Sequence, residues 1–224
     1  MKSIKHIIFI LTILVFTSCE DYLEPEPTSV ISSVNFYSDE TQLMQGVFNM
    51  YDGLQGMNDT SSRSNHATQI EFYVTEMRSD NTRSKSGEGE AAQFDNFAVE
   101  ATNGLIADHY RSFYNVIFRA NTVLENIGVA SESNKAKIEG EAKFVRAYVY
   151  FNLVRLYGAL PLIDNVVSVG DDASYIRRSV EDVYELIVSD LNSAVAGLDN
   201  FNGKNRATKS VSYTHLRAHE TSLH

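Results

Sequence analysis

The chain has 224 residues, enough for one sizeable domain, and carries a net charge of −10 at neutral pH. Nucleic-acid-binding domains present a basic face, so this charge argues against nucleic acid as a partner. The single cysteine excludes a disulfide framework within the chain, so its meaning depends on its position.

The first residues carry the features of an export signal. Lys2 and Lys5 precede an apolar run, residues 7–16, which is followed by Thr17-Ser18-Cys19. Ten residues rise only about 15 Å as a helix, roughly half a bilayer core, so the run is a signal and not a stable span. Small residues before a cysteine at this distance resemble the bacterial lipoprotein signal. We therefore predict a lipoprotein signal peptide at residues 1–18 and a lipidated Cys19, with an ordinary cleaved signal and an incidental cysteine as the alternative.

Residues 19–37 are predicted to form an extended tether, because prolines disfavour helix and acidic side chains keep the segment solvated. Glu20 and Asp21, directly after the cysteine, resemble the surface-export pattern of Bacteroidota lipoproteins. Ser38 and Asp39 then cap a first helix, whose apolar residues recur at three-to-four spacing.

Residues 57–103 are rich in Ser, Asn, Thr and Gly and show little periodicity. Gln69 to Met77 fits a short helix or a strand, and the pattern does not decide between them. A long irregular segment inside a domain is often functional, but a surface insertion fits the composition as well. Both interpretations stay open.

A long amphipathic helix is predicted from Gly104, with an apolar stripe that ends at Gly128. The aromatic residues of this stripe are expected to be core. His109 lies on or beside the stripe and fits a core residue better than a ligand, because no second His, Cys or paired carboxylate lies at metal spacing with it.

The helix that begins at Glu132 and ends at Gly158 is apolar over most of its circumference, which predicts burial among other helices. A short polar link joins it to the preceding helix, so the two should pack as an antiparallel pair. Glu141 falls inside the apolar arc. We expect it to be partly buried and bonded to a donor on the preceding helix, Arg119 or Asn121, because an unpaired buried carboxylate is costly.

Ser179 and Asp182 form a capping-box pattern before another helix, and its apolar stripe extends to Leu198. Helix pairs of this size indicate tetratricopeptide-like repeats, which bury their faces by stacking. We therefore predict an all-α fold with one clear helix pair and a third long helix whose partner is missing.

Residues 139–163 (EGEAKFVRAYVYFNLVRLYGALPLI) resemble the signature E-A-x-F-x-R-A-x-x-Y-F-x-L-x-x-x-Y/F-G-x-x-P-L of SusD/RagB proteins. The resemblance extends over residues 19–209 and implies a SusD-like α-α superhelix. Family members are considerably longer, so residues 38–209 are expected to be an incomplete N-terminal helical-repeat domain. Four other stretches match the family in the same order: residues 19–27, 36–54, 114–121 and 178–198.

The resemblance also implies a function. SusD/RagB proteins are outer-membrane lipoproteins that bind a glycan or another nutrient at the cell surface and pair with a TonB-dependent, SusC-like transporter. The alternative is a lipid-anchored helical-repeat scaffold without a small-molecule ligand. We expect no enzyme and no cofactor, because Glu139 and Glu141 point to different sides of their helix and no P-loop or nucleophile elbow is present. In the family much of the ligand site comes from the later part, so no ligand-binding residue is assigned.

Residues 210–224 are predicted to be a non-native tail. They resemble a translated sequencing adapter and lack the alanine-rich stripe expected of the family's next helix. The segment holds three of the six histidines, and His215 and His219 are spaced i, i+4. A zincin helix needs H-E-x-x-H, and Leu223 stands where its second histidine should be, so no metal site is predicted.

Overall fold

The computed structural model describes residues 36–56, 66–79, 81–84, 89–167, 170 and 175–222. The chain divides into two units, Met1–Phe36 and Tyr37–His224, and the described helices and strands lie in the second. The predicted signal peptide, Cys19 and most of the predicted tether lie outside the described residues. Among the helices described here, none is long and apolar enough to span a membrane.

The unit Tyr37–His224 is helical, as predicted, with one pair of two-residue antiparallel strands. In chain order the main elements are α4 (Glu40–Gly53), α5 (His66–Thr75), α6 (Ala92–Asp95), α7 (Gly104–Glu125), α8 (Glu132–Tyr157), β1 (Leu160–Pro161), β2 (Arg177–Arg178), α9 (Val180–Gly197) and α10 (Lys209–Ser222). Short 3-10 turns occupy Glu76–Arg78, Gly89–Ala91 and Ile127–Val129.

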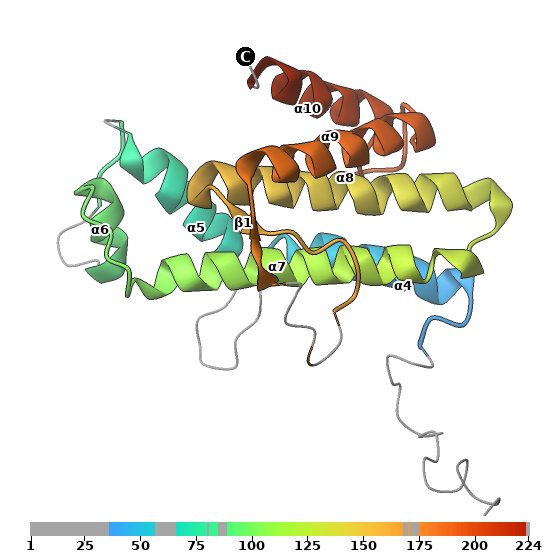
Figure 1. Cartoon of the computed structure of the whole chain (residues 1–224), viewed down its shortest axis with the longest axis horizontal. Coiled ribbons are helices and arrows are strands. Elements are labelled where there is room, and N and C mark those ends of the chain that lie inside the picture. The colour runs from blue at the N-terminus through green and yellow to red at the C-terminus, as the bar shows by residue number, and fades with distance from the viewer. Residues whose placement is uncertain are drawn as a thin grey trace, which may run out of the picture. The chain divides into compact units, whose positions relative to one another are not determined.

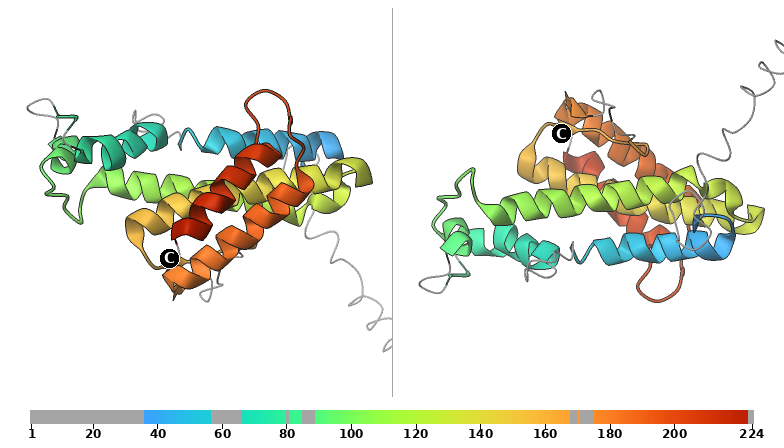
Figure 2. Two further views of the ribbon diagram at one scale, coloured as in Figure 1. Left: turned by 90° about the horizontal axis from the view of Figure 1, so that it is seen from above. Right: turned by 90° about the horizontal axis from the view of Figure 1, so that it is seen from below.

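The long helices α7 and α8 run antiparallel, and α9 and α10 follow as a second antiparallel pair (Figure 1). Helices α4 and α5 pack along α7, whereas α9 packs on α8 and α10 packs on α9 (Figure 2). This stacking of successive helix pairs is the arrangement of tetratricopeptide-like repeats. The all-α prediction is therefore confirmed.

Polar caps begin the helices where the sequence predicts them. The Asp39 carboxylate accepts the amide of the third residue beyond it, at the start of α4. At α9 the Ser179 hydroxyl accepts the Asp182 amide and the Asp182 carboxylate accepts the Ser179 amide, a complete capping box. Helix α8 ends at Gly158, whose φ of +70° is one that L side chains rarely adopt.

The stretch Gln69 to Met77, which the sequence left undecided, is helical. It falls within α5 and the 3-10 turn that follows it. Its apolar side chains form a small cluster of their own, against which residues from the start of α7 and the end of α8 pack. The buried members of this cluster are Ile70, Val74, Met77 and Phe94.

Helices α8 and α9 approach closely because glycines lie at their contact. A Cβ at Gly197 would lie 2.2 Å from the backbone oxygen of Ala136, and one at Gly140 would lie 3.1 Å from Leu198. A side chain at position 197 would therefore force the two helices apart. Both glycines are explained by packing, not by chain flexibility.

The prediction that the last long helix lacks a partner is wrong, because α10 packs against α9. Ser212 and Leu216 are buried, and Leu216 joins the main core. His215 contacts the rings of Phe144 and Tyr148 edge-on, at centroid distances of 5.6 and 5.8 Å. The non-native origin of residues 210–224 stays a prediction.

Glu141 is fully buried and paired, but with partners that the sequence did not suggest. Arg206 forms an ion pair with it, and the Tyr51 hydroxyl donates to its Oε2 at 2.9 Å. The two predicted donors on α7 are engaged elsewhere. Arg119 donates to a backbone oxygen of α4, and Asn121 bonds the segment after α8. The expectation of a paired carboxylate is confirmed, the burial is complete and not partial as expected, and the predicted donors are wrong.

Candidate functional site

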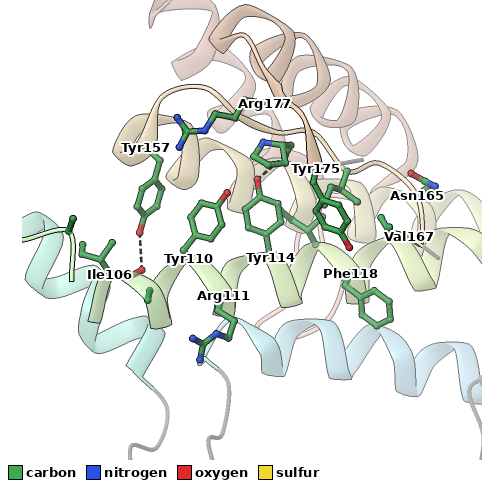
Figure 3. Close-up of a pocket in the computed structure, with 15 residues that line it drawn as sticks. Ile106, Tyr110, Arg111, Tyr114, Phe118, Tyr157, Asn165, Val167, Tyr175 and Arg177 are labelled. Carbon is green, nitrogen blue, oxygen red and sulfur yellow. Dashed lines mark hydrogen bonds between the residues drawn. The ribbon is translucent and has the colours of Figure 1, made fainter. Parts of the chain in front are cut away.

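A groove of about 800 Å³ runs along α7 and is bordered by the segment that follows α8 (Figure 3). We call residues 158–167 of this segment the strap. Fifteen described residues line the groove, and its wall is largely aromatic and aliphatic. The aromatic lining residues are Tyr110, Tyr114, Phe118, Tyr157 and Tyr175.

The tyrosines form a row because of helical spacing. Tyr110 and Tyr114 lie one turn apart on α7 and so share a face. Their ring centroids are 4.7 Å apart, and Tyr157 at the end of α8 meets Tyr110 edge-on at 5.2 Å. Each of the three is only partly buried. The row therefore offers ring faces to a ligand while its members hold one another in place.

Side chains of α7 hold the strap in place by donating hydrogen bonds to the backbone oxygens of the strap. The Tyr114 hydroxyl donates to the oxygen of Pro161 at 2.7 Å. The Asn121 amide donates to the oxygens of Ile163 and Asn165 at 3.1 and 2.9 Å. One wall of the groove is thus tied directly to the helix that forms its floor.

A buried ion pair between α8 and α9 also holds the strap in position. The Arg146 guanidinium donates to both carboxylate oxygens of Asp190 on α9, at 2.7 and 2.8 Å. Its remaining nitrogen donates to Asn121 Oδ1 at 2.8 Å and to the backbone oxygen of Asp164 at 2.9 Å. Arg146 therefore joins α7, α9 and the strap at one point.

Two polar residues of α8 are buried. Arg146 is 5% exposed and Tyr150 is 0% exposed. The Tyr150 hydroxyl accepts the amide of Ile163 at 2.7 Å, so it too holds the strap. The sequence pattern did not predict this role. The available signal was the motif R-A-x-x-Y, which places both side chains on one helix face.

Burial raises the pKa of the Tyr114 and Tyr157 hydroxyls above the ordinary value for tyrosine. These hydroxyls therefore stay protonated at neutral pH, able both to donate and to accept hydrogen bonds. Ring faces for C–H surfaces, with a few hydroxyl and amide groups among them, suit a polyhydroxylated ring such as a sugar. In the part of the chain that the structure describes, no group of three or more metal-ligating side chains occurs.

His109 lies in the core beneath this row, as the sequence predicts. It is 0% exposed, and its ring lies 4.2 Å from the ring of Phe113. Its Nδ1 is 3.0 Å from the Tyr157 hydroxyl. Burial lowers the pKa of His109 to about 4, so the ring is neutral at pH 7.

The buried His109 should make the fold sensitive to acid. The folded state takes up this proton only near pH 4 and the unfolded chain near pH 6.5, so the unfolded state binds more protons between these values. The protonation of His109 by itself should therefore lower the free energy of unfolding by about 3 kcal/mol as the pH drops from 7 to 4. Urea titrations of the purified chain and of His109→Phe at pH 7 and pH 4 measure the effect. The variant should show a smaller acid loss, and equal losses in both proteins would contradict the assignment.

The family model described as "starch-binding associating with outer membrane" matches residues 21–218. The chain belongs to the SusD-like family. The resemblance seen in the sequence is therefore confirmed, and so is the helical fold.

Individual SusD-like proteins support the assignment. A SusD-like protein of Formosa agariphila is 30% identical over 204 residues, which are 88% of this chain and 39% of that protein. A solved SusD-like protein of Bacteroides fragilis is 27% identical with a TM-score of 0.65, over 83% of this chain and 35% of the other. A protein solved with a xylogluco-oligosaccharide is 26% identical with a TM-score of 0.66, over 79% of this chain and 34% of the other. The chain thus spans about two fifths of the length of the curated relatives it matches.

The sequence assigns no ligand-binding residue and predicts that the aromatic stripe of α7 is core. The structure divides that stripe. Phe113 is buried in the core and does not line the groove, whereas Tyr110 and Tyr114 are partly buried and line it. Periodicity gives the direction of a side chain but does not show whether another element covers it.

Proposed function

We propose that this chain is part of a cell-surface lipoprotein that binds an extracellular glycan and delivers it to a TonB-dependent, SusC-like outer-membrane transporter. The tyrosine row along α7 carries the proposal for glycan binding, because it supplies ring faces and hydroxyls in one open groove. The family description of starch binding and outer-membrane association supports it. A relative solved with a xylogluco-oligosaccharide supports the same ligand class.

Attachment to the membrane rests on Cys19. We propose that residues 1–18 are a lipoprotein signal peptide and that Cys19 carries the lipid, with Glu20 and Asp21 directing the protein to the outer face. The groove would then face extracellular saccharides.

The same proposal makes the protein a binding protein and not an enzyme. Glu141, the one buried carboxylate of α8, is held by Arg206 and Tyr51 and does not line the groove. The acid–base pair of a glycosidase needs two carboxyl groups facing one saccharide bond. Turnover of any glycan by the purified protein would contradict this.

Replacing the exposed tyrosine of the groove should weaken glycan binding without unfolding the chain. Tyr175 is 61% exposed, so its loss removes a ring face but little core packing. Tyr175→Ala is expected to weaken binding roughly tenfold, the equivalent of about 1.4 kcal/mol. Affinity electrophoresis and calorimetry against a polysaccharide panel, which includes a xylogluco-oligosaccharide, measure the change.

Tyr213→Ala is the matched control, because Tyr213 is 50% exposed on α10 and does not line the groove. Its affinity should equal that of the unaltered chain. Equal losses in the two variants, or none in Tyr175→Ala, would show that the groove is not the binding site.

The alternative function is a lipid-anchored helical-repeat scaffold without a small-molecule ligand. Stacked helix pairs present extended surfaces for protein partners, and this favours the alternative on fold alone. Binding to no saccharide of the panel would support it. Co-purification of the anchored protein with a large outer-membrane barrel would support delivery of a ligand to a transporter.

A further inference from the structure

The charged side chains that line the groove are all positive. Among the fifteen described lining residues, only Arg111 and Arg177 are charged at neutral pH, and no carboxylate is present. Arg111 is paired with Asp108 at 3.5 Å and lies on the opposite side of the α7 ribbon from Tyr110 (Figure 3). Arg177 is therefore the charged side chain that can pair with a ligand bound on the tyrosine side of α7.

Arg177 lies on the same side of α7 as the tyrosine row (Figure 3). Its backbone is fixed by strand pairing, because Pro161 of β1 pairs with Arg177 of β2. Burial raises the pKa of the Tyr114 hydroxyl, and the positive charge of Arg177 opposes that rise, so the guanidinium acts electrostatically on the groove. In the part of the chain described here, Arg177 has no carboxylate within ion-pair distance.

The rest of the molecule does not favour anions. The net charge of −10 repels a polyanion at a distance, so binding of one would depend on a local site. A ligand that covers the tyrosine row would remove water from Arg177. A neutral sugar leaves that charge without a counter-ion, whereas a carboxylate or sulfate compensates it through two parallel hydrogen bonds.

We propose that the groove binds an acidic saccharide, whose ring lies on the tyrosine row and whose carboxylate or sulfate pairs with Arg177. This inference rests on the proposed glycan-binding function and names the class of glycan. The tyrosines supply affinity for the ring, and Arg177 supplies the preference for charge.

Matched pairs of saccharides test the preference. Oligogalacturonate is compared with its methyl ester for the carboxylate, and dextran sulfate is compared with dextran for the sulfate. The unaltered chain should bind at least one acidic member roughly tenfold more tightly than its neutral partner, with the preference falling at high salt. The pair that shows the difference identifies which acid the groove takes.

Substitutions of two neighbouring arginines distinguish a specific ion pair in the groove from general electrostatic attraction. Side chains of successive strand residues point to opposite faces, and Arg178 does not line the groove. Arg177→Gln should abolish the preference, whereas Arg178→Gln makes the same change of net charge and should retain it. Arg177→Lys keeps the charge without the planar fork and should retain part of the preference. Helical circular dichroism spectra confirm that each variant is folded.

The outcomes distinguish this inference from the proposed function. Equal binding of acidic and neutral members would overturn the inference and leave glycan binding intact. Equal losses in Arg177→Gln and Arg178→Gln would overturn it as well, because the attraction would then be general. Binding to no saccharide of either kind would overturn both proposals.

Discussion

Asp190→Ala is expected to lower the free energy of unfolding by about 3–5 kcal/mol, because it leaves the Arg146 guanidinium buried without its carboxylate. Arg146 and Asp190 are 5% and 2% exposed, so water cannot replace the lost partner. The strap also depends on this pair, since the same guanidinium bonds the backbone of Asp164. Urea unfolding followed by circular dichroism measures the loss.

Two comparisons sharpen this test. Asp108→Ala removes the carboxylate of a surface pair and should cost less than about 1 kcal/mol. The double variant Arg146→Met with Asp190→Leu removes both buried charges and should recover at least half of the loss. A cost for Asp190→Ala as small as that of Asp108→Ala would show that the buried pair does not stabilise the fold.

Arg206→Ala is expected to lower the free energy of unfolding by a similar amount, about 3–5 kcal/mol, because Glu141 is 0% exposed and would be left buried without its cationic partner. Arg206 donates from Nε to Glu141 Oε2 at 2.8 Å, and the next amide, Ala207, donates to the Tyr51 hydroxyl at 3.0 Å. These bonds attach the link between α9 and α10 to α4 and α8. Urea unfolding measures the loss, and limited proteolysis should cleave this link more readily in the variant.

Glu141→Gln provides the internal control for this prediction. In the Arg206→Ala background it removes the buried charge, so it should restore part of the lost stability. Lys135→Ala breaks a surface pair with Glu132 and should change stability by less than about 1 kcal/mol. If Glu141→Gln made the Arg206→Ala variant still less stable, the loss would not come from the buried carboxylate.

Local signals were sufficient for the starts of α4 and α9 and for the end of α8. The Ser179–Asp182 capping box, the Asp39 cap and the Gly158 stop all lie where the sequence predicts them, because a cap involves residues three or four positions apart. Weak periodicity left Gln69 to Met77 undecided, since packing against α7 and α8 decides its conformation. The motif at residues 139–163 also indicated the family that the comparison confirms.

The candidate site could be predicted only in part. The sequence placed Tyr110 and Tyr114 on one helical stripe with Phe113, and the stripe gave no means to separate groove from core. The groove exists because the strap returns across α7, and that path depends on Arg146, held by an Asp190 that lies 44 residues further along the chain.

By itself, then, the sequence determined where α4, α7, α8 and α9 begin, the buried character of α8, the paired state of Glu141 and the family. These follow from periodicity, capping and residue order, which are local in the chain. Only the tertiary structure decided that Glu141 pairs with Arg206, 65 residues away, and not with Arg119 or Asn121. A helical wheel gives the direction of a charged side chain, but the cation that meets it is set by how distant segments pack, and spacing along one helix carries no information about that.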